Sequence, residues 1–178
     1  MKTIQSVVSL VLLSMGIFLI NGCGESPQAQ VAKRIPLEDF FKKPQQSGHK
    51  LSPDGKSYLH RATVNGINNI FIREIGASES IQLTQSMDRD IQRFFWGNPE
   101  VVLYLQDSEG DEIFKLYGVN ISSKEVSCLT DYDGAHTSII DLYDNDSDVI
   151  IIGLNKRDLE NPDVYQLNIR TGTLQLIQ

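Results

Sequence analysis

The stretch Trp96-Gly97-Asn98-Pro99-Glu100 places a polar turn after an apolar residue, and it opens the middle one of three similar segments. The other two segments open with Leu51-Ser52-Pro53-Asp54-Gly55 and Leu142-Tyr143-Asp144-Asn145-Asp146, so the pattern returns after roughly 45 residues. Each segment continues through a strand-like middle and a strand-like end. The middles are Asn69-Ile70-Phe71, Glu112-Ile113-Phe114 and Asp163-Val164-Tyr165, and the ends are Ile81-Gln82-Leu83, Val126-Ser127-Cys128-Leu129 and Leu174-Gln175-Leu176. Short strands that repeat with this period indicate one small sheet per repeat.

The turns and apolar runs divide the segments into strands. In the first segment we expect central strands at residues 56–64 and 68–75, joined by Asn65-Gly66, because both residues tolerate the positive φ of a tight hairpin. Two runs are apolar without alternation, which indicates strands buried on both faces: Val101-Val102-Leu103-Tyr104-Leu105 and Val149-Ile150-Ile151-Ile152. The other strands are expected at residues 91–96, 113–121, 125–130, 138–143, 164–169 and 173–177.

These patterns predict an all-β fold of about three four-stranded, β-propeller-like blades, at residues 46–85, 91–131 and 138–178. One turn of helix is expected before them, at residues 37–41. Closed propellers have about 4–8 blades, so three blades make an incomplete propeller. Its end face and strand edges would be exposed, and we expect either a missing domain or self-association through the exposed blade edge to cover them.

The N-terminal residues are typical of a bacterial lipoprotein signal. Lys2 precedes a mostly apolar run from Val7 to Ile20, which fits a secretory signal and is shorter than the ~20 residues of a membrane-spanning helix. The run ends at Ile20-Asn21-Gly22-Cys23, which resembles a lipobox, so we predict a signal helix at residues 1–22, lipidation of Cys23 and a flexible tether at residues 23–34. The lipid would anchor the protein to a membrane of the cell envelope, on the periplasmic side or in the outer membrane. An ordinary signal peptide or an uncleaved anchor is the alternative.

Composition argues against several other functions. The net charge of −7 repels phosphate backbones, and no basic patch with interleaved aromatic residues occurs, so no nucleic-acid partner is predicted. Cys128 has no disulfide partner once Cys23 is acylated, and its position matches that of Gln82, so we expect a small, half-buried side chain there.

No metal or cofactor is predicted. The histidines are too scattered for ligand spacing: His49, His60 and His136. A calcium loop is imitated by the alternation of Asp144, Asp146 and Asp148, but Val149 and Asn155 stand where glycine and an acidic residue are required. We interpret this stretch as a solvated acidic turn.

Two polar loops hold the candidate substrate or interdomain contacts. The first loop contains four carboxylates, Asp107, Glu109, Asp111 and Glu112, although the backbone demands of a hairpin explain its aspartates equally well. The second, at residues 155–162, is long for a compact β fold and contains Arg157 and Asp158. Arg157 either binds a carboxylate of a ligand or pairs with Asp158 or a neighbouring blade, and we favour the pairing.

The order of these motifs resembles the N-terminal propeller of prolyl oligopeptidase-type serine peptidases (family S9), in the acylaminoacyl-peptidase and dipeptidyl-peptidase-like branch. The resemblance spans residues 35–178. It rests on the lead-in Ile35-Pro36-Leu37-Glu38-Asp39-Phe40-Phe41 and on Leu51-Ser52-Pro53-Asp54-Gly55-Lys56, Gln106-Asp107-Ser108-Glu109-Gly110-Asp111-Glu112, Leu129-Thr130-Asp131 and Leu154-Asn155-Lys156-Arg157-Asp158. The motif S-P-D-G alone also occurs in TolB-like propellers.

The resemblance implies a substrate-gating domain, which in such enzymes caps an α/β-hydrolase domain that holds the catalytic residues. No catalytic residue is assigned here, because the nucleophile's G-x-S-x-G-G elbow is not found: in Gly76-Ala77-Ser78-Glu79-Ser80, serine replaces the second glycine. We therefore expect a non-catalytic propeller portion whose complete protein would hydrolyse peptides in the cell envelope. The alternative is a stand-alone TolB-like propeller lipoprotein that binds a protein partner or self-assembles.

Overall fold

The computed structural model describes residues 34–42, 44–144 and 147–177, and the chain divides into two units, Met1–Lys42 and Lys43–Gln178. In the first unit lies a short helix, α2 (Leu37–Phe41), with Glu38 and Asp39 in its first turn, where acidic side chains favour the helix dipole. This helix confirms the single turn expected at residues 37–41. The predicted signal helix, the lipidation site Cys23 and nearly all of the tether lie outside the described residues. In the parts of the chain that the structure describes, no helix combines the length and apolar character needed to cross a membrane.

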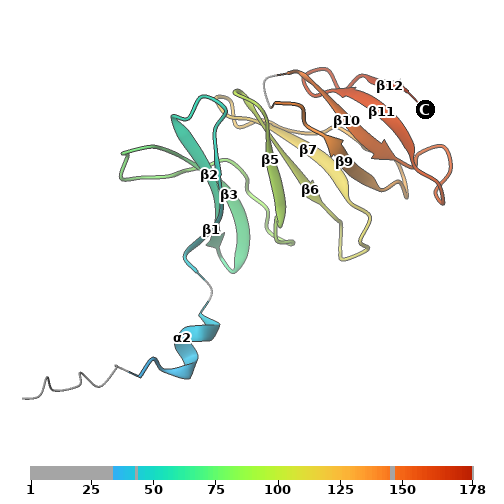
Figure 1. Ribbon diagram of the computed structural model, residues 1–178. Helices are drawn as coiled ribbons and strands as arrows, with labels where there is room; N and C mark the ends of the chain where they lie inside the picture. Colours follow the sequence, from blue (N-terminus) through green and yellow to red (C-terminus); the bar gives the residue numbers. More distant parts are fainter. Residues whose placement is uncertain (1–33, 43, 145–146, 178) are drawn as a thin grey trace, which may run out of the picture. The chain divides into compact units, whose positions relative to one another are not determined.

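The second unit is built from three antiparallel sheets, each of four strands in sequence order (Figure 1). The first sheet contains β1 (Gln46–Leu51), β2 (Ser57–Val64), β3 (Ile67–Glu74) and β4 (Ile81–Gln82). The second contains β5 (Arg93–Asn98), β6 (Val101–Gln106), β7 (Lys115–Asn120) and β8 (Val126–Cys128). The third contains β9 (Thr137–Asp141), β10 (Val149–Leu154), β11 (Asp163–Asn168) and β12 (Leu174–Leu176). The predicted all-β class and the three four-stranded blades are confirmed.

The tight hairpin between β2 and β3 forms as the sequence predicts. Asn65 has φ 51° and Gly66 has φ 88°, and the flanking Val64 pairs with Ile67. Two successive positive φ angles give the primed turn that matches the twist of antiparallel strands.

The register of the sheets corrects one part of the sequence repeat. Phe71 pairs with Gln82, and Tyr117 pairs with Cys128 in the second sheet. The counterpart of Phe71 is therefore Tyr117, whereas the repeat suggested Phe114. Phe114 instead ends the loop that follows β6, and that loop is longer than the corresponding hairpin of the first sheet. The expected match of Cys128 with Gln82 is confirmed, and Cys128 is half-buried.

The core consists of two hydrophobic clusters that lie between consecutive sheets. The cluster between the first and second sheets includes Leu59, Ile70, Trp96, Val102 and Val119. The cluster between the second and third sheets includes Leu103, Leu116, Ile150, Ile152 and Leu167. Residues 101–105 are all buried because sheets cover both faces of β6, as their apolar run predicts. In β10, Val149 and Ile151 are only half-buried because they point away from the second sheet.

A repeated backbone hydrogen bond aligns the three sheets residue by residue. The N–H of Ile75 donates to Lys56 (2.8 Å), that of Ile121 to Glu100 (3.0 Å) and that of Ile169 to Asp148 (2.7 Å). In each case the donor directly follows the third strand of its sheet, and the acceptor directly precedes the second strand. Ile75, Ile121 and Ile169 thus occupy equivalent positions.

Candidate functional site

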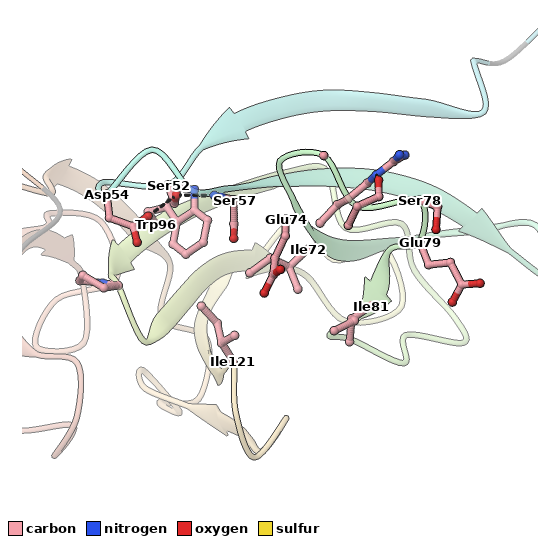
Figure 2. A pocket seen from close by; sticks show the side chains of 14 residues that line it. Ser52, Asp54, Ser57, Ile72, Glu74, Ser78, Glu79, Ile81, Trp96 and Ile121 are labelled. Atoms are coloured by element: carbon pink, nitrogen blue, oxygen red, sulfur yellow. Dashed lines mark hydrogen bonds between the residues drawn. The ribbon is translucent and has the colours of Figure 1, made fainter.

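A cleft of about 790 Å³ opens between the first and second sheets. It lies at the end of the sheets where β1 turns into β2 and β3 continues to β4. The turn residues Ser52 and Asp54, residues 76–79 and Pro99 of the β5–β6 turn contribute to its lining. Figure 2 shows side chains from both sheets around this space.

The walls of the cleft are apolar. Ile72 and Ile81 come from the first sheet, and Trp96 and Ile121 come from the second (Figure 2). The Nε1–H of Trp96 donates to the carbonyl oxygen of Lys50 at 3.0 Å, a bond between the two sheets that fixes the indole ring. The tryptophan is nearly buried, whereas Ile81 is about half exposed.

Three carboxylates and one guanidinium, that of Arg73, also line the cleft; the Nε–H of Arg73 donates to the carbonyl oxygen of Ala77 at 2.7 Å. Asp54, Glu74 and Glu79 line the cleft and are exposed. The Ser52 hydroxyl donates to Asp54 at 2.7 Å, and the N–H of Lys56 donates to it at 3.1 Å; these bonds hold the pKa of Asp54 below its usual range. The Asp54 carboxylate is therefore ionised at neutral pH. Aliphatic walls beside carboxylates suit an ammonium or guanidinium group carried on an apolar stem.

Smaller clefts lie at the equivalent place on the second and third sheets. Between the second and third sheets, Gly118 and Ser127 replace Ile72 and Ile81, and the volume is about 350 Å³. On the third sheet, Gln166 and Gln175 take these positions, and the volume is about 320 Å³. The first cleft is the largest of these three, and its third-to-fourth strand connection is one residue longer than the others.

The cleft has apolar and charged side chains that can bind a ligand, but its lining does not contain the paired serine and histidine of a serine hydrolase. Its serines, Ser52, Ser57 and Ser78, have no histidine beside them in the lining. Gly76, with φ 89°, lies in the connection from β3 to β4, so this segment is a strand-to-strand loop and not the strand-to-helix elbow of a serine nucleophile. Among the described residues, no cluster of three or more His, Cys, Asp or Glu side chains is placed to hold a metal ion.

The first predicted contact loop is held together by its own charges. Asp107 is buried and accepts two hydrogen bonds from Arg89, from Nε at 3.2 Å and from Nη2 at 2.7 Å. The Arg89 guanidinium holds the pKa of Asp107 below its usual range. Asp111 accepts the N–H groups of Ser108 (3.3 Å) and Ile113 (3.0 Å), which shapes the turn. Asp107 and Asp111 thus have structural partners.

The other two carboxylates of this loop are more open. Glu109 (φ 52°) and Glu112 (φ 60°) adopt left-handed backbone conformations, and both are exposed. Their contact with a substrate or a second domain stays a prediction.

The second predicted contact loop corrects the expected pairing of Arg157. Its guanidinium makes two hydrogen bonds of 2.6 Å to Asp163, at the start of β11 in the same sheet. The predicted alternatives, Asp158 and a neighbouring blade, are wrong, because Asp158 instead accepts the N–H of Glu160 (3.0 Å) and an Asn161 amide hydrogen (2.9 Å). The preference for an intramolecular pair is confirmed, with a partner six residues further along the chain.

The predicted loops and the cleft lie at opposite ends of the sheets. Both loops join a second strand to a third, whereas the cleft is bounded by connections from first to second and from third to fourth strands. Sequence reasoning missed Glu74, Glu79 and Arg89. The one available signal was the alternation of side chains along the third strand, which places Glu74 on the same face of the sheet as Ile72.

The arrangement of three consecutive four-stranded sheets with buried inter-sheet clusters defines a β-propeller portion. The fold is similar to that of a putative TolB from Agrobacterium tumefaciens, with a TM-score of 0.54 and 15% identity, over 77% of this chain and 50% of that chain. It is also similar to the acylaminoacyl peptidase of Pyrococcus horikoshii, with a TM-score of 0.52 and 14% identity, over 75% of this chain and 25% of that chain. No protein-family profile matches the chain.

Sequence comparison adds two curated relatives. Dipeptidyl aminopeptidase BIII of Pseudoxanthomonas mexicana is 30% identical over 146 residues, which are 81% of this chain and 21% of that protein. Dipeptidyl peptidase family member 6 of Caenorhabditis elegans is 31% identical over 155 residues, 80% of this chain and 20% of that protein. The chain resembles the propeller domain of S9 dipeptidyl and acylaminoacyl peptidases. It spans about a fifth of the length of these curated relatives.

Proposed function

We propose that this chain is the substrate-gating propeller portion of an S9-type peptidase of the cell envelope. The observation that carries the proposal is the 30% identity to dipeptidyl aminopeptidase BIII, which extends over 146 residues and so over most of the three-sheet unit. The chain supplies no nucleophile elbow in the described residues, so hydrolysis would be performed by a hydrolase domain that accompanies the propeller. The propeller would restrict and orient the peptides that reach it.

We further propose that the first cleft binds a positively charged part of the peptide. Glu74 and Glu79, together with Asp54, which also lies 3.6 Å from Lys56 Nζ, outnumber the single positive charge of Arg73 in the lining. They would attract an α-ammonium group or a lysine side chain, and the apolar walls would contact the adjoining aliphatic groups. The size of the cleft supports this role, because its volume of about 790 Å³ falls in the range of ~300–1,000 Å³ that is usual for ligand pockets.

Recovery of the native protein tests the peptidase proposal. An antibody against residues 44–177 should capture from the source cells a polypeptide that extends beyond Gln178 and releases dipeptides from dipeptidyl p-nitroanilides. A serine-directed phosphonate should abolish that release. Capture of a polypeptide that ends at Gln178 and has no such activity, alone or with co-purifying proteins, would overturn the proposal and favour the binding lipoprotein.

The cleft proposal has its own readout, because Trp96 is the single tryptophan of the chain and lines the cleft. Titration with the peptide Lys-Ile-Lys-amide should change its fluorescence, and Glu-Ile-Glu should not. A variant with Glu74→Gln and Glu79→Gln should weaken binding about tenfold. The matched control is Asp133→Asn with Glu160→Gln, two exposed carboxylates that do not line the cleft. Equal affinities for both peptides would refute the assignment.

We also propose that Cys23 anchors the protein by a lipid. The support is the apolar run followed by Ile20-Asn21-Gly22-Cys23. Cells fed an alkyne-tagged fatty acid should label the full chain, and Cys23→Ser should remove the label and release the protein from the membrane fraction. Label retained in the Cys23→Ser variant would contradict the proposal.

A further inference from the structure

The first cleft contains one positive group that the binding of an ammonium does not use. Arg73 lines the cleft and is half-buried. Three other arginines, Arg89, Arg157 and Arg170, each pair with a carboxylate, whereas Arg73 makes no ion pair within the part of the chain that the structure describes. Its one hydrogen bond there is the bond from Nε to Ala77, so both Nη groups keep their hydrogen atoms for a ligand.

The guanidinium is held against the loop that joins β3 to β4. The N–H of Ala77 donates to the carbonyl oxygen of Glu74 at 3.1 Å, and the carbonyl oxygen of Ala77 accepts the Nε–H of Arg73. Ser78 follows in the same loop and lines the cleft, and its hydroxyl has no hydrogen-bond partner among the described residues. A guanidinium fork beside a hydroxyl is a donor set that suits a carboxylate.

The charged groups are spread along the cleft. Asp54 belongs to the turn from β1 to β2, whereas Ser78 and Glu79 belong to the connection from β3 to β4, and Figure 2 shows them at opposite ends with Glu74 between them. Because the sheet has the order β1-β2-β3-β4, the turn and the connection are two strand spacings apart, which is about 10 Å. The cleft therefore has an acidic end, formed by Asp54 and Glu74, and an opposite end that holds the Arg73 loop.

This separation matches the length of a short peptide. An extended peptide spans about 7 Å if it has two residues and about 10 Å if it has three. Its α-ammonium group could thus lie at the acidic end while its α-carboxylate accepts hydrogen bonds from Arg73. Ile72 and Ile81 line the cleft as well, and they would contact aliphatic side chains of the peptide.

We infer that the first cleft binds a peptide of two or three residues with both termini free, and that Arg73 selects the free carboxylate. The inference rests on the proposed binding of an ammonium group in this cleft and extends it to the other end of the ligand. A dipeptide released by a peptidase has this form, whereas a longer substrate would be bound by its ammonium group alone. Glu79 limits the affinity, because its carboxylate repels that of the ligand.

Fluorescence of Trp96 in the detergent-solubilised full chain tests the role of Arg73. The dipeptide Leu-Ile should bind at least about tenfold more tightly than Leu-Ile-amide. Arg73→Gln should lower the affinity for Leu-Ile to that for the amide and leave the affinity for the amide unchanged, which also shows that the cleft is still folded. Arg73→Lys should keep part of the preference. Lys124→Gln is the matched control, because it removes one exposed positive charge outside the cleft lining and should keep the whole preference.

The possible results separate this inference from the proposal on which it rests. Equal affinities of the wild type for Leu-Ile and Leu-Ile-amide would overturn the inference and leave the ammonium site in place. A preference that survives Arg73→Gln would overturn the role of Arg73. If neither dipeptide binds, the inference is overturned, and if Lys-Ile-Lys-amide does not bind either, the ammonium site is overturned with it.

Two further titrations test the placement of the two ends. Glu74→Gln should weaken the binding of Leu-Ile, whereas Glu79→Gln should strengthen it about threefold and should not strengthen that of the amide. The peptide Leu-Ile-Pro-Pro-Pro is stiff and spans about 15 Å, so its carboxylate would pass beyond Arg73, and its free-acid and amide forms should bind equally. Weaker binding of Leu-Ile to the Glu79→Gln variant, or a free-acid preference retained by the longer peptide, would overturn the two-ended arrangement.

Discussion

Gly97 stands in β5 where the pairing with β6 shifts by one residue, and it is packed too closely for any side chain. A Cβ added there would lie 2.8 Å from Cδ1 of Ile169 and 3.0 Å from Cγ of Leu103. Leu103 is fully buried and Ile169 nearly so, and a shift of either side chain would disturb its packing against its neighbours. Overpacking of this kind costs about 1–3 kcal/mol, and we expect Gly97→Ala to lower the free energy of unfolding by about 2 kcal/mol.

A double-mutant cycle assigns this loss to the contact between the sheets. Ile169→Val removes the Cδ1 that the new Cβ would touch, and by itself it should cost about 0.5–1.5 kcal/mol. In the double variant the methyl groups no longer collide, so its loss should be smaller than the sum of the single losses by about 1 kcal/mol. Gly118→Ala is the matched control, because its Cβ would meet Leu129 only at 3.3 Å. We expect that variant to lose less than half as much.

Urea unfolding at one protein concentration measures all four variants. Trp96 fluorescence reports on the residue next to Gly97, and far-ultraviolet circular dichroism reports on the sheets as a whole; coincident curves justify a two-state fit. Losses that add within about 0.3 kcal/mol would refute the reasoning, because the Cβ introduced by Gly97→Ala and the Cδ1 of Ile169 would then not be in contact. A neutral Gly97→Ala would refute it as well.

Three further predictions concern ionisable groups. Arg89→Ala should destabilise the chain at pH 7, and its difference from the wild type should shrink as the pH falls below about 4, because the lowered pKa of Asp107 stabilises the folded state only while the carboxylate is ionised. Burial lowers the pKa of His60, so stability should fall as the pH drops below about 6.5 and the unfolded state takes up the proton; His60→Gln should flatten this part of the pH profile in urea titrations. Burial raises the pKa of the Cys128 thiol, so iodoacetamide at pH 8 should modify it at least about tenfold more slowly in the native chain than in urea, as followed by peptide mass spectrometry.

The sequence predicts the frame of this fold because turns and buried strands depend on nearby residues. Asn65-Gly66 requires a tight hairpin whatever surrounds it, and the unbroken run at residues 101–105 requires cover on both faces. The repeat correctly matches Cys128 with Gln82, yet it misplaces Phe114, since an inserted loop changes the spacing without changing the composition. Strand alignment becomes visible only when both partners of each pair are known.

The predicted contacts were less accurate because ion pairs depend on distances across loops. Arg157 has a carboxylate directly beside it in the sequence, yet it bonds Asp163, since the turn of residues 158–161 brings the start of β11 to the guanidinium. Asp107 pairs with Arg89, which belongs to the connection between the first two sheets. Neither partner could be selected from the sequence, because several charged residues lie within reach of each loop.

The three equivalent clefts show how stability and binding can be separated within one repeated fold. The backbone hydrogen bond of the isoleucine that follows the third strand is the same in all three sheets, so the side chains that line the clefts can differ without loss of that bond. The second cleft has small residues, Gly118 and Ser127, and Ile169 of the third sheet packs against them almost completely buried. The first cleft has Ile72 and Ile81 at these positions and a longer connection, and Ile121 of the second sheet is only half-buried. Apolar side chains left open to water next to carboxylates weaken the packing that the second cleft achieves, so their presence supports a ligand, rather than the fold, as the reason for the wider first cleft.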